Sequence, residues 1–377
     1  MNTDVTQGSI ASLEFGRFLL PGPTEVHPDV IEAMRRPMVA HRGADMVNLF
    51  KSIEPPLQRI WRTTRRVLVG TCSATGFMEL AVRSGVRNRA LAVVTGAFGE
   101  RFGGIAAASG KDVVRLDVPL GKTVEPDMLW DALKRSDADA VTVVHSETST
   151  GALAPLDKLA AVVREFDNVV LLVDAVSSCA GSPIETDLWG LDFVLTGSQQ
   201  ALALPPGLAL GVASDRMLER SRTVPERGAY FDILAYDQAA MDYQPTHTPA
   251  MPLLYALERQ LARIEEEGGV ESRWARHDRM RQVVERWVEG PGGSLGFSFL
   301  PALGRRSWTV SCLEVPGKSK GRELVKALQR EGWSIGTGYG PLKQSTLRIG
   351  HMGDHSPENV ERMLRVLEQV AATYARV

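Results

Sequence analysis

Between residues 91 and 213 the sequence alternates short apolar runs with segments of helical periodicity. Most runs are continuous stretches of leucine and β-branched residues bounded by polar turns, as in strands that are buried on both faces of a parallel sheet. We expect strands at residues 91–95, 113–116, 140–145, 169–174, 193–196 and 208–213, and helices near 77–86, 99–109, 127–136 and 155–166. This alternation predicts an α/β domain whose largely parallel sheet is covered by helices.

From about residue 251 the pattern changes to longer helices and scattered strands. The last helix has a clear start, because Ser356 can cap it and Pro357 suits its first turn. Its apolar stripe is expected to be Val360, Met363, Leu364, Leu367, Val370 and Ala371. The other expected elements are helices at 253–266, 274–289 and 321–331 and strands at 297–300, 309–314, 334–337 and 347–350. We therefore divide the chain into an N-terminal arm (1–16), a large domain (17–265) and a smaller C-terminal α+β domain (266–377).

The composition is that of a globular protein of 377 residues, with 44% apolar and 23% charged residues. A formal net charge of −2 gives no electrostatic reason to bind nucleic acid or an anionic membrane. The cysteines, Cys72, Cys179 and Cys312, have no metal-binding spacing and are expected to be reduced. The polar start and the lack of a run long enough to span a membrane favour a cytoplasmic protein without a membrane partner.

Two patterns near the start of the large domain suggest a ligand. Ser73-Ala74-Thr75-Gly76 opens a predicted helix, where hydroxyl and free backbone N–H groups form an anion site. The alternative is a plain N-cap. Phe98, which follows a predicted strand within Gly96-Ala97-Phe98-Gly99, offers an aromatic face to a flat ring, and its alternative is an ordinary place in the core.

Two further patterns lie where predicted strands end. His145-Ser146-Glu147-Thr148-Ser149-Thr150-Gly151 sits at such an end, and open α/β sheets bind ligands there; the alternative is a capping turn. Asp174 closes the apolar run 169–174. Because a buried carboxylate without a partner is costly, we expect a cation beside it. The alternative is a strand-end aspartate that faces water.

Arg348 lies in Thr346-Leu347-Arg348-Ile349-Gly350-His351-Met352-Gly353. Its planar guanidinium suits a two-point contact with a carboxylate. In a chain so rich in arginine, a surface role is the alternative.

These five patterns, in this order and over nearly the whole chain, resemble the class V aminotransferase family in its alanine/serine–glyoxylate (serine–pyruvate) branch. The resemblance implies fold type I of the enzymes that use pyridoxal 5′-phosphate (PLP). This fold has a large domain with a mainly parallel, seven-stranded-type sheet covered by helices, and a smaller C-terminal α+β domain. It also implies PLP as cofactor, a small amino acid or 2-oxo acid as substrate, and a homodimer with active sites at its interface.

The resemblance assigns roles to matching residues. Those implied to bind the cofactor are Ser73, Ala74, Thr75 and Gln199 at the phosphate, Thr148 beside the ring, Phe98 and Val176 on its two faces, Asp174 at the pyridine nitrogen, and Thr248 of the partner subunit at the phosphate. Pairing with Asp174 keeps the ring an electron sink. Arg348 is implied to grip the substrate α-carboxylate. Two departures weaken the match: Ala74 replaces the usual glycine, and His247 replaces a frequent tyrosine.

The family carries Ser-Gln-Lys where this chain has Ser198-Gln199-Gln200. The resemblance implies that residue 200 should be the lysine that anchors PLP as a Schiff base, offers a reactive imine and carries a proton at the substrate Cα. An amide does none of these. Lys343 is the only candidate substitute by position, and the family tends to have a lysine there as well. We expect PLP to bind non-covalently, with Asp174 and the residue-200 position as the catalytic positions.

Three functions stay open at this point. The first is an aminotransferase-family enzyme acting on alanine or serine with glyoxylate or pyruvate, with transamination impaired or altered by Gln200. The second is a non-catalytic protein that binds PLP or an amino acid adduct of it. The third is a lysine-independent PLP enzyme with His145 or His351 as the base.

Overall fold

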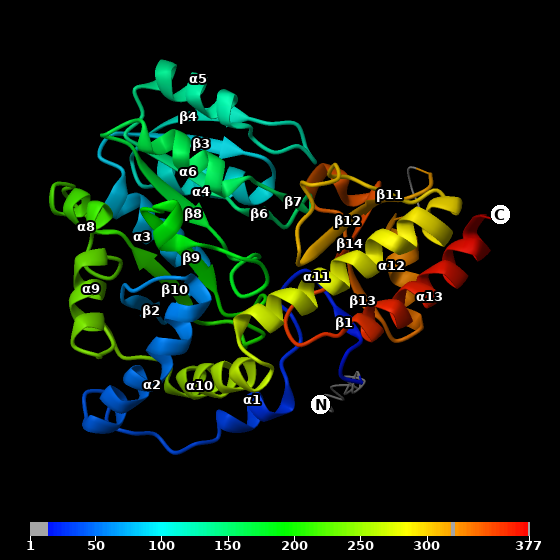
Figure 1. Cartoon of the computed structure of the whole chain (residues 1–377), viewed down its shortest axis with the longest axis horizontal. Helices are drawn as coiled ribbons and strands as arrows, with labels where there is room; N and C mark the ends of the chain where they lie inside the picture. The colour runs from blue at the N-terminus through cyan, green and yellow to red at the C-terminus, as the bar shows by residue number, and fades with distance from the viewer. Residues whose placement is uncertain (1–13, 318–320, 376–377) are drawn as a thin grey trace, which may run out of the picture.

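The computed structural model describes residues 14–317 and 321–375. A large sheet with its helices and a smaller sheet with its own helices lie side by side, and helix α11 (Val270–Trp287) runs from the first onto the second (Figure 1). The predicted arm, residues 1–16, lies outside the described residues except for 14–16, where Phe15 and Gly16 form a turn.

The large sheet has seven strands in the order β2-β10-β9-β8-β5-β3-β4. Only β10 runs against its neighbours, β2 and β9, so the other strands all share one direction. Their bounds are β2 (Val67–Gly70), β3 (Arg89–Val94), β4 (Asp112–Asp117), β5 (Ala140–Val144), β8 (Val170–Asp174), β9 (Phe193–Gly197) and β10 (Ala209–Ala213). The predicted α/β class with a mainly parallel seven-stranded sheet is confirmed.

Helices cover both faces of this sheet, which explains why its central strands are apolar throughout. Along β8, Leu171 and Val173 pack into one core cluster, whereas Val170 and Leu172 pack into the other. The first cluster joins the sheet to α1 (Pro28–Ala33), α2 (Ala44–Trp61), α5 (Pro126–Ser136), α6 (Leu156–Arg164), α7 (Thr186–Trp189) and α10 (Met251–Glu266). The second joins it to α3 (Ala74–Gly85), α4 (Ala97–Ala108), α8 (Asp215–Arg222) and α9 (Ile233–Met241).

The small sheet has five strands in the order β1-β13-β14-β12-β11. Its strands are β1 (Phe18–Leu19), β11 (Ser298–Phe299), β12 (Val310–Glu314), β13 (Ser334–Thr337) and β14 (Thr346–Gly350). Besides α11, this part contains η1 (Val288–Gly292), α12 (Gly321–Arg330), η2 (Gly340–Lys343) and α13 (Pro357–Ala375). The division at residues 265/266 stays a prediction, and β1 brings residues 18–19 into the small sheet as a parallel partner of β13.

The start of α13 agrees with the sequence prediction. The Ser356 hydroxyl accepts a hydrogen bond from the Asn359 N–H at 3.3 Å, and the Asn359 side chain accepts one from the Ser356 N–H at 3.0 Å. The predicted stripe packs into the core of the small domain, with Val370 only partly buried. Within residues 14–317 and 321–375, we find no helix with the length and apolar character to cross a bilayer.

Candidate active site

Several predicted site residues lie at the carboxyl edge of the large sheet, where β5, β8 and β9 end. Asp174 ends β8, and it pairs with Leu195 of β9. Two residues further along β9, Gly197 approaches the start of α3, because a Cβ atom on Gly197 would lie 3.1 Å from Ala74 Cβ. The strand pair β8–β9 therefore joins the Asp174 end of the site to the α3 end.

Asp174 is a buried carboxylate with few polar groups to stabilise its charge. Its side chain is 2% exposed, and one oxygen accepts a hydrogen bond from the Val176 N–H at 2.8 Å. Among the described residues it has no ion-pair partner within 4.0 Å. Burial raises the pKa of Asp174 to about 7. The Val176 hydrogen bond and the charge of Arg101 oppose this rise in pKa, and the nearby Glu147 adds to it. A cation placed beside Asp174 would restore the ordinary preference of this group for its charged form.

Glu147 is a second buried carboxylate, and the sequence analysis gave it no role. It is 1% exposed and accepts hydrogen bonds from the N–H groups of Phe98 and Gly99, both at 3.2 Å, and of Ser149 at 3.1 Å. These contacts fix the first turn of α4, which carries Phe98, to the short hairpin of β6 (Ser146–Glu147) and β7 (Ala152–Leu153). A lone acid in a hydroxyl-rich motif was the only sequence signal for this anchor.

The Phe98 ring lies near the boundary between the two domains. The Arg101 guanidinium carbon is 4.8 Å from its centroid, and the Tyr339 ring is 6.0 Å away with an angle of 39°. Val176 is half-buried just beyond β8. The stacking of a flat ligand between Phe98 and Val176 stays a prediction. A cavity of about 360 Å³ near the start of α4 is lined in part by Ala97, Ser149 and Tyr339, and its lining includes neither Phe98 nor Val176.

The start of α3 is open to solvent. Ser73 and Thr75 are exposed, Ala74 is buried, and the Ser73 side chain makes no capping hydrogen bond. Gln199 lies next to this turn, since a Cβ atom on Gly197 would fall 2.7 Å from its side-chain oxygen. The amide nitrogen of Gln199 makes no hydrogen bond within the described residues. The turn and Gln199 thus leave donor groups free for an anion.

Gln200 is 6% exposed and packs against the segment that precedes α1. Its amide nitrogen donates to the Pro21 carbonyl at 3.3 Å, while its amide oxygen is buried and has no hydrogen-bond partner in the described part of the chain. Gly22 has φ +102, and a Cβ atom there would lie 2.0 Å from the Gln200 nitrogen. Residue 22 must therefore lack a side chain for Gln200 to adopt this position.

Arg348 on β14 bridges the two domains. Its Nε donates to the Thr337 carbonyl at 2.9 Å, and its Nη1 donates to the Thr148 carbonyl at 3.1 Å. Its second terminal nitrogen, Nη2, makes no hydrogen bond within the described residues. The Thr148 hydroxyl is hydrogen-bonded to Ser177, just after β8. Arg348, Thr148 and the end of β8 therefore meet at one point.

Thr248 is not joined to these residues in the single chain. It is exposed, and its neighbour His247 stacks on Tyr230 at 4.3 Å with an angle of 10°. Ala250 donates to the Thr71 hydroxyl at 3.0 Å, which holds this loop near the end of β2. The implied contact of Thr248 with the site of a partner subunit stays a prediction.

The two histidines considered as bases are deeply buried. Burial lowers the pKa of His145 to about 4, and its Nδ1 contacts the Ser178 hydroxyl at 3.0 Å. Burial lowers the pKa of His351 to about 3, and its Nε2 contacts the Ser311 hydroxyl at 2.8 Å. Both rings are therefore neutral at pH 7. Lys343, in η2, is exposed.

Comparison with known proteins shows the family and the fold. The family model for class V aminotransferases matches residues 103–360. An uncharacterized aminotransferase of Methanocaldococcus jannaschii is 34% identical over 355 residues, which cover 93% of this chain and 91% of that protein. L-aspartate–glyoxylate aminotransferase of Paracoccus denitrificans is 30% identical over 89% of this chain and 85% of its own.

The crystal structure of alanine–glyoxylate aminotransferase from Nostoc sp. is similar over 94% of both chains, with a TM-score of 0.87 and 30% identity. The family match covers well over half of this chain, and the fold is that of its solved relatives. The chain therefore belongs to the class V aminotransferase family and has PLP fold type I.

Proposed function

We propose that this protein binds PLP reversibly together with a small 2-amino or 2-oxo acid, and that Gln200 impairs transamination. PLP is the cofactor of the family, and the residues at the carboxyl edge of the sheet suit it. Alanine or serine as donor and glyoxylate or pyruvate as acceptor follow from the resemblance, and a named relative acts on glyoxylate.

Asp174 is the observation that carries the proposal. A carboxylate that is 2% exposed, with one backbone donor and a pKa of about 7, is costly to keep in a folded chain. A protonated pyridine nitrogen supplies the missing positive charge. Among the described residues no lysine or arginine lies within ion-pair distance of Asp174, and the charge of Arg101 acts on it only from further away, so the group suits a cationic ligand.

The other residues fit the remaining parts of the cofactor. The open start of α3, with Ser73 and Thr75, and the free amide nitrogen of Gln199 are suited to a phosphate. Phe98 and Val176 would hold the ring, and Arg348 would hold a substrate carboxylate through its free Nη2. When bound, PLP supplies an electron sink that stabilises negative charge at the substrate Cα.

Gln200 limits what this site does with a bound substrate. Its amide is neutral, is not nucleophilic, and already donates to the Pro21 carbonyl. It cannot accept a proton from the substrate Cα or attach the cofactor covalently. General acid–base catalysis contributes about 10²- to 10⁴-fold to a rate, so losing this step alone slows turnover by that order.

The direct test is a PLP titration of the purified protein. We expect saturable binding that dialysis reverses, and no mass increase of the chain after borohydride reduction, because residue 200 offers no amine. Fluorescence titration and intact-mass spectrometry measure the two results. A chain that shows no saturable binding of PLP, or one that reduction labels at another lysine such as Lys343, contradicts the proposal.

Arg348 gives a second prediction, on substrate binding. Arg348→Lys keeps the charge but loses the fork, so we expect alanine affinity to fall about 10- to 100-fold while PLP affinity changes little. Spectral titration of the PLP-loaded protein with alanine measures this. Arg89→Lys, at an exposed ion pair with Asp112, is the matched control. Equal loss of PLP and alanine affinity would instead assign Arg348 a purely structural role, through Thr337 and Thr148.

One observation favours a second, non-catalytic function. The buried Gln200 oxygen has no hydrogen-bond partner within residues 14–317 and 321–375, and it can only accept a hydrogen bond. Pyridoxamine phosphate carries an amine where PLP has an aldehyde, so it can satisfy this oxygen. Tighter binding of pyridoxamine phosphate than of PLP, with no turnover of alanine and glyoxylate, would favour this role. The homodimer and the cytoplasmic location stay predictions.

A further inference from the structure

Arg273, in the first turn of α11, contacts the peptide between Ala201 and Leu202, one residue beyond Gln200. Its side chain is 1% exposed. Its Nη2 donates to the Ala201 carbonyl at 2.7 Å, and its Nε donates to the same oxygen at 3.3 Å. Two donors from one planar group fix both the position and the direction of that carbonyl.

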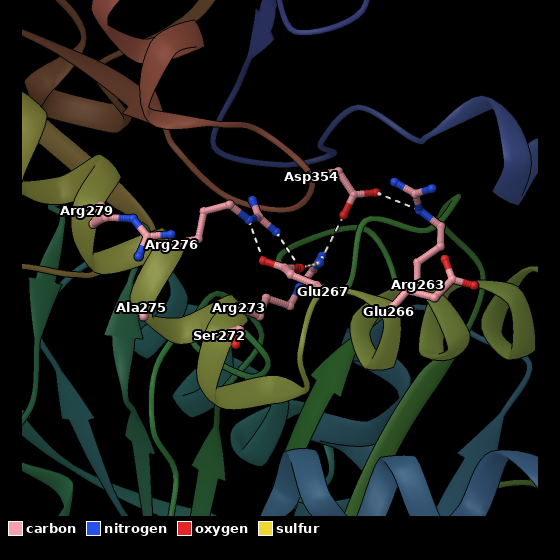
Figure 2. Close-up of a pocket in the computed structure, with 9 residues that line it drawn as sticks. All are labelled: Arg263, Glu266, Glu267, Ser272, Arg273, Ala275, Arg276, Arg279 and Asp354. Atoms are coloured by element: carbon pink, nitrogen blue, oxygen red, sulfur yellow. Dashed lines mark hydrogen bonds and ion pairs between the residues drawn. The ribbon is translucent and has the colours of Figure 1, made fainter.

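Two carboxylates hold Arg273 from the other side. Its Nη1 donates to Asp354 at 2.9 Å and to Glu267 at 3.3 Å, and Figure 2 shows both acids turned toward it. Gln260 also donates to Asp354, at 3.1 Å. Burial lowers the pKa of Arg273, and the charge of Asp354 opposes this. The guanidinium is therefore held rigidly between fixed acceptors.

The same cluster holds the segment that follows Arg348. His277 Nε2 accepts from the Gly353 N–H at 3.1 Å, and Arg276 donates to the Gly353 carbonyl at 2.9 Å. On the other side, the Thr24 N–H donates to the Gln199 carbonyl at 2.9 Å, and the Thr24 hydroxyl donates to the Met352 carbonyl at 3.4 Å. The segments that bracket residue 200 and follow β14 are thus tied together.

We propose that Arg273 is a positioning residue, which fixes the side chain at position 200 relative to Arg348 through the Ala201 carbonyl. This inference rests on the proposed function, because it needs a ligand between the two residues. The Thr24 contact to the Gln199 carbonyl and the Arg273 contact to the Ala201 carbonyl fix the backbone on both sides of residue 200, and this backbone sets the direction of that side chain. A shift of about 1 Å in a reacting group costs up to about 100-fold in rate, so a rigid carbonyl contact affects chemistry without touching the ligand.

Lysine is a poor substitute at this position. Its single ammonium group has no fixed fork, so it cannot hold Ala201, Asp354 and Glu267 in one plane. Arg273→Lys keeps the charge between the two acids and should fold, whereas Arg273→Met leaves both acids without their partner. The lysine variant therefore separates loss of positioning from loss of the fold.

The test uses the Gln200→Lys background, where turnover is measurable. We expect Arg273→Lys to lower kcat for alanine and glyoxylate about 10- to 100-fold, with the KM for alanine changed less than about threefold. The pH midpoint of the visible absorbance of bound PLP should also shift, because the amine at residue 200 is displaced. In the native chain, PLP affinity should stay within about threefold of the parent, because the phosphate and ring contacts are unchanged.

Arg279→Met is the matched control, since Arg279 is exposed and lines the same hollow without contacting Ala201. An unchanged kcat and absorbance midpoint in Arg273→Lys overturns the positioning role. A parallel fall of kcat, PLP affinity and thermal stability assigns Arg273 to the fold alone. If Gln200→Lys itself neither attaches PLP nor turns over, the proposed function fails, and this inference fails with it.

Discussion

Gln200→Lys should attach PLP covalently and raise kcat for transamination between alanine and glyoxylate by about 10²- to 10⁴-fold over the native chain. The lysine regains a nucleophilic amine at the position that faces Pro21 and Gly22. It also regains a group that accepts and returns a proton at the substrate Cα. Both gains concern chemistry, so the affinity for the phosphate end should change much less.

The surroundings of residue 200 can accept this change. The glutamine amide lies against Gly22, which has no side chain, and among the residues that the structure describes it hydrogen-bonds only to the Pro21 carbonyl, at 3.3 Å. A lysine amine would keep a donor for that carbonyl until PLP binds. The buried location disfavours the charged ammonium form, which leaves more of the reactive neutral amine at pH 7 to 8.

Two measurements check the result: borohydride reduction followed by peptide mapping, and coupled assay of pyruvate formation. Gln200→Met, of similar length and without a donor, and Gln200→Arg, which adds charge but no nucleophile, are the controls. Neither should attach PLP. If the native chain and the lysine variant turn over at the same rate, this protein uses another group as the base that moves the substrate proton.

The strands of the large sheet were predictable because their burial on both faces makes them apolar throughout. For each predicted strand in the large domain, the predicted ends differ from the observed ends by at most two residues. Strand β2 is not predictable from the local pattern, because it is a run of only four residues that pairs with β10 from far along the chain. Helix α2 is not predictable from that pattern either, because its interior contains Pro55 and Pro56. Packing of Ile53 and Leu57 into the core outweighs the lost helical hydrogen bonds.

Local motifs locate Asp174 at the end of β8 and Ser73 just before α3, whereas Arg348 lies in the middle of β14. The roles of these three residues stay predictions. Glu147 and Arg273 were not predictable as anchors, because each acts on backbone groups far away in sequence. Such contacts depend on how the elements pack, and no local spacing encodes them.

The second large effect concerns Asp174 and has opposite signs for folding and for binding. Without PLP at pH 8, Asp174→Asn should increase the free energy of unfolding by about 1–3 kcal/mol. The amide keeps an oxygen for the Val176 N–H, which now donates to Asp174 at 2.8 Å, and it removes a buried charge. The same change should weaken PLP binding by about 100-fold or more, because the pyridine nitrogen loses its counter-ion.

The sign of the pH dependence follows from the raised pKa. In the folded chain the pKa of Asp174 is about 7. In the unfolded chain it is about 3.9, so folding takes up a proton between these values. The destabilisation caused by the charge is therefore absent below about pH 4, grows as the pH rises to about 7, and is complete above that. The stability difference between Asp174→Asn and the native chain should widen over this range.

Urea unfolding of the native chain and of Asp174→Asn at pH 5 and pH 8, each with and without PLP, measures the free energy of unfolding under these four conditions. Asp139→Asn is the matched control, because the Asp139 carboxylate already accepts from the backbone N–H groups of Arg87 and Asn88, both at 2.8 Å. Neutralising that satisfied carboxylate should destabilise the chain at pH 8 with PLP present or absent. An Asp174→Asn chain that is less stable than the native one without PLP, yet binds PLP as tightly, would mean that Asp174 is a structural acid. In that case the positive charge that compensates the Asp174 carboxylate would come from the protein itself and not from bound PLP.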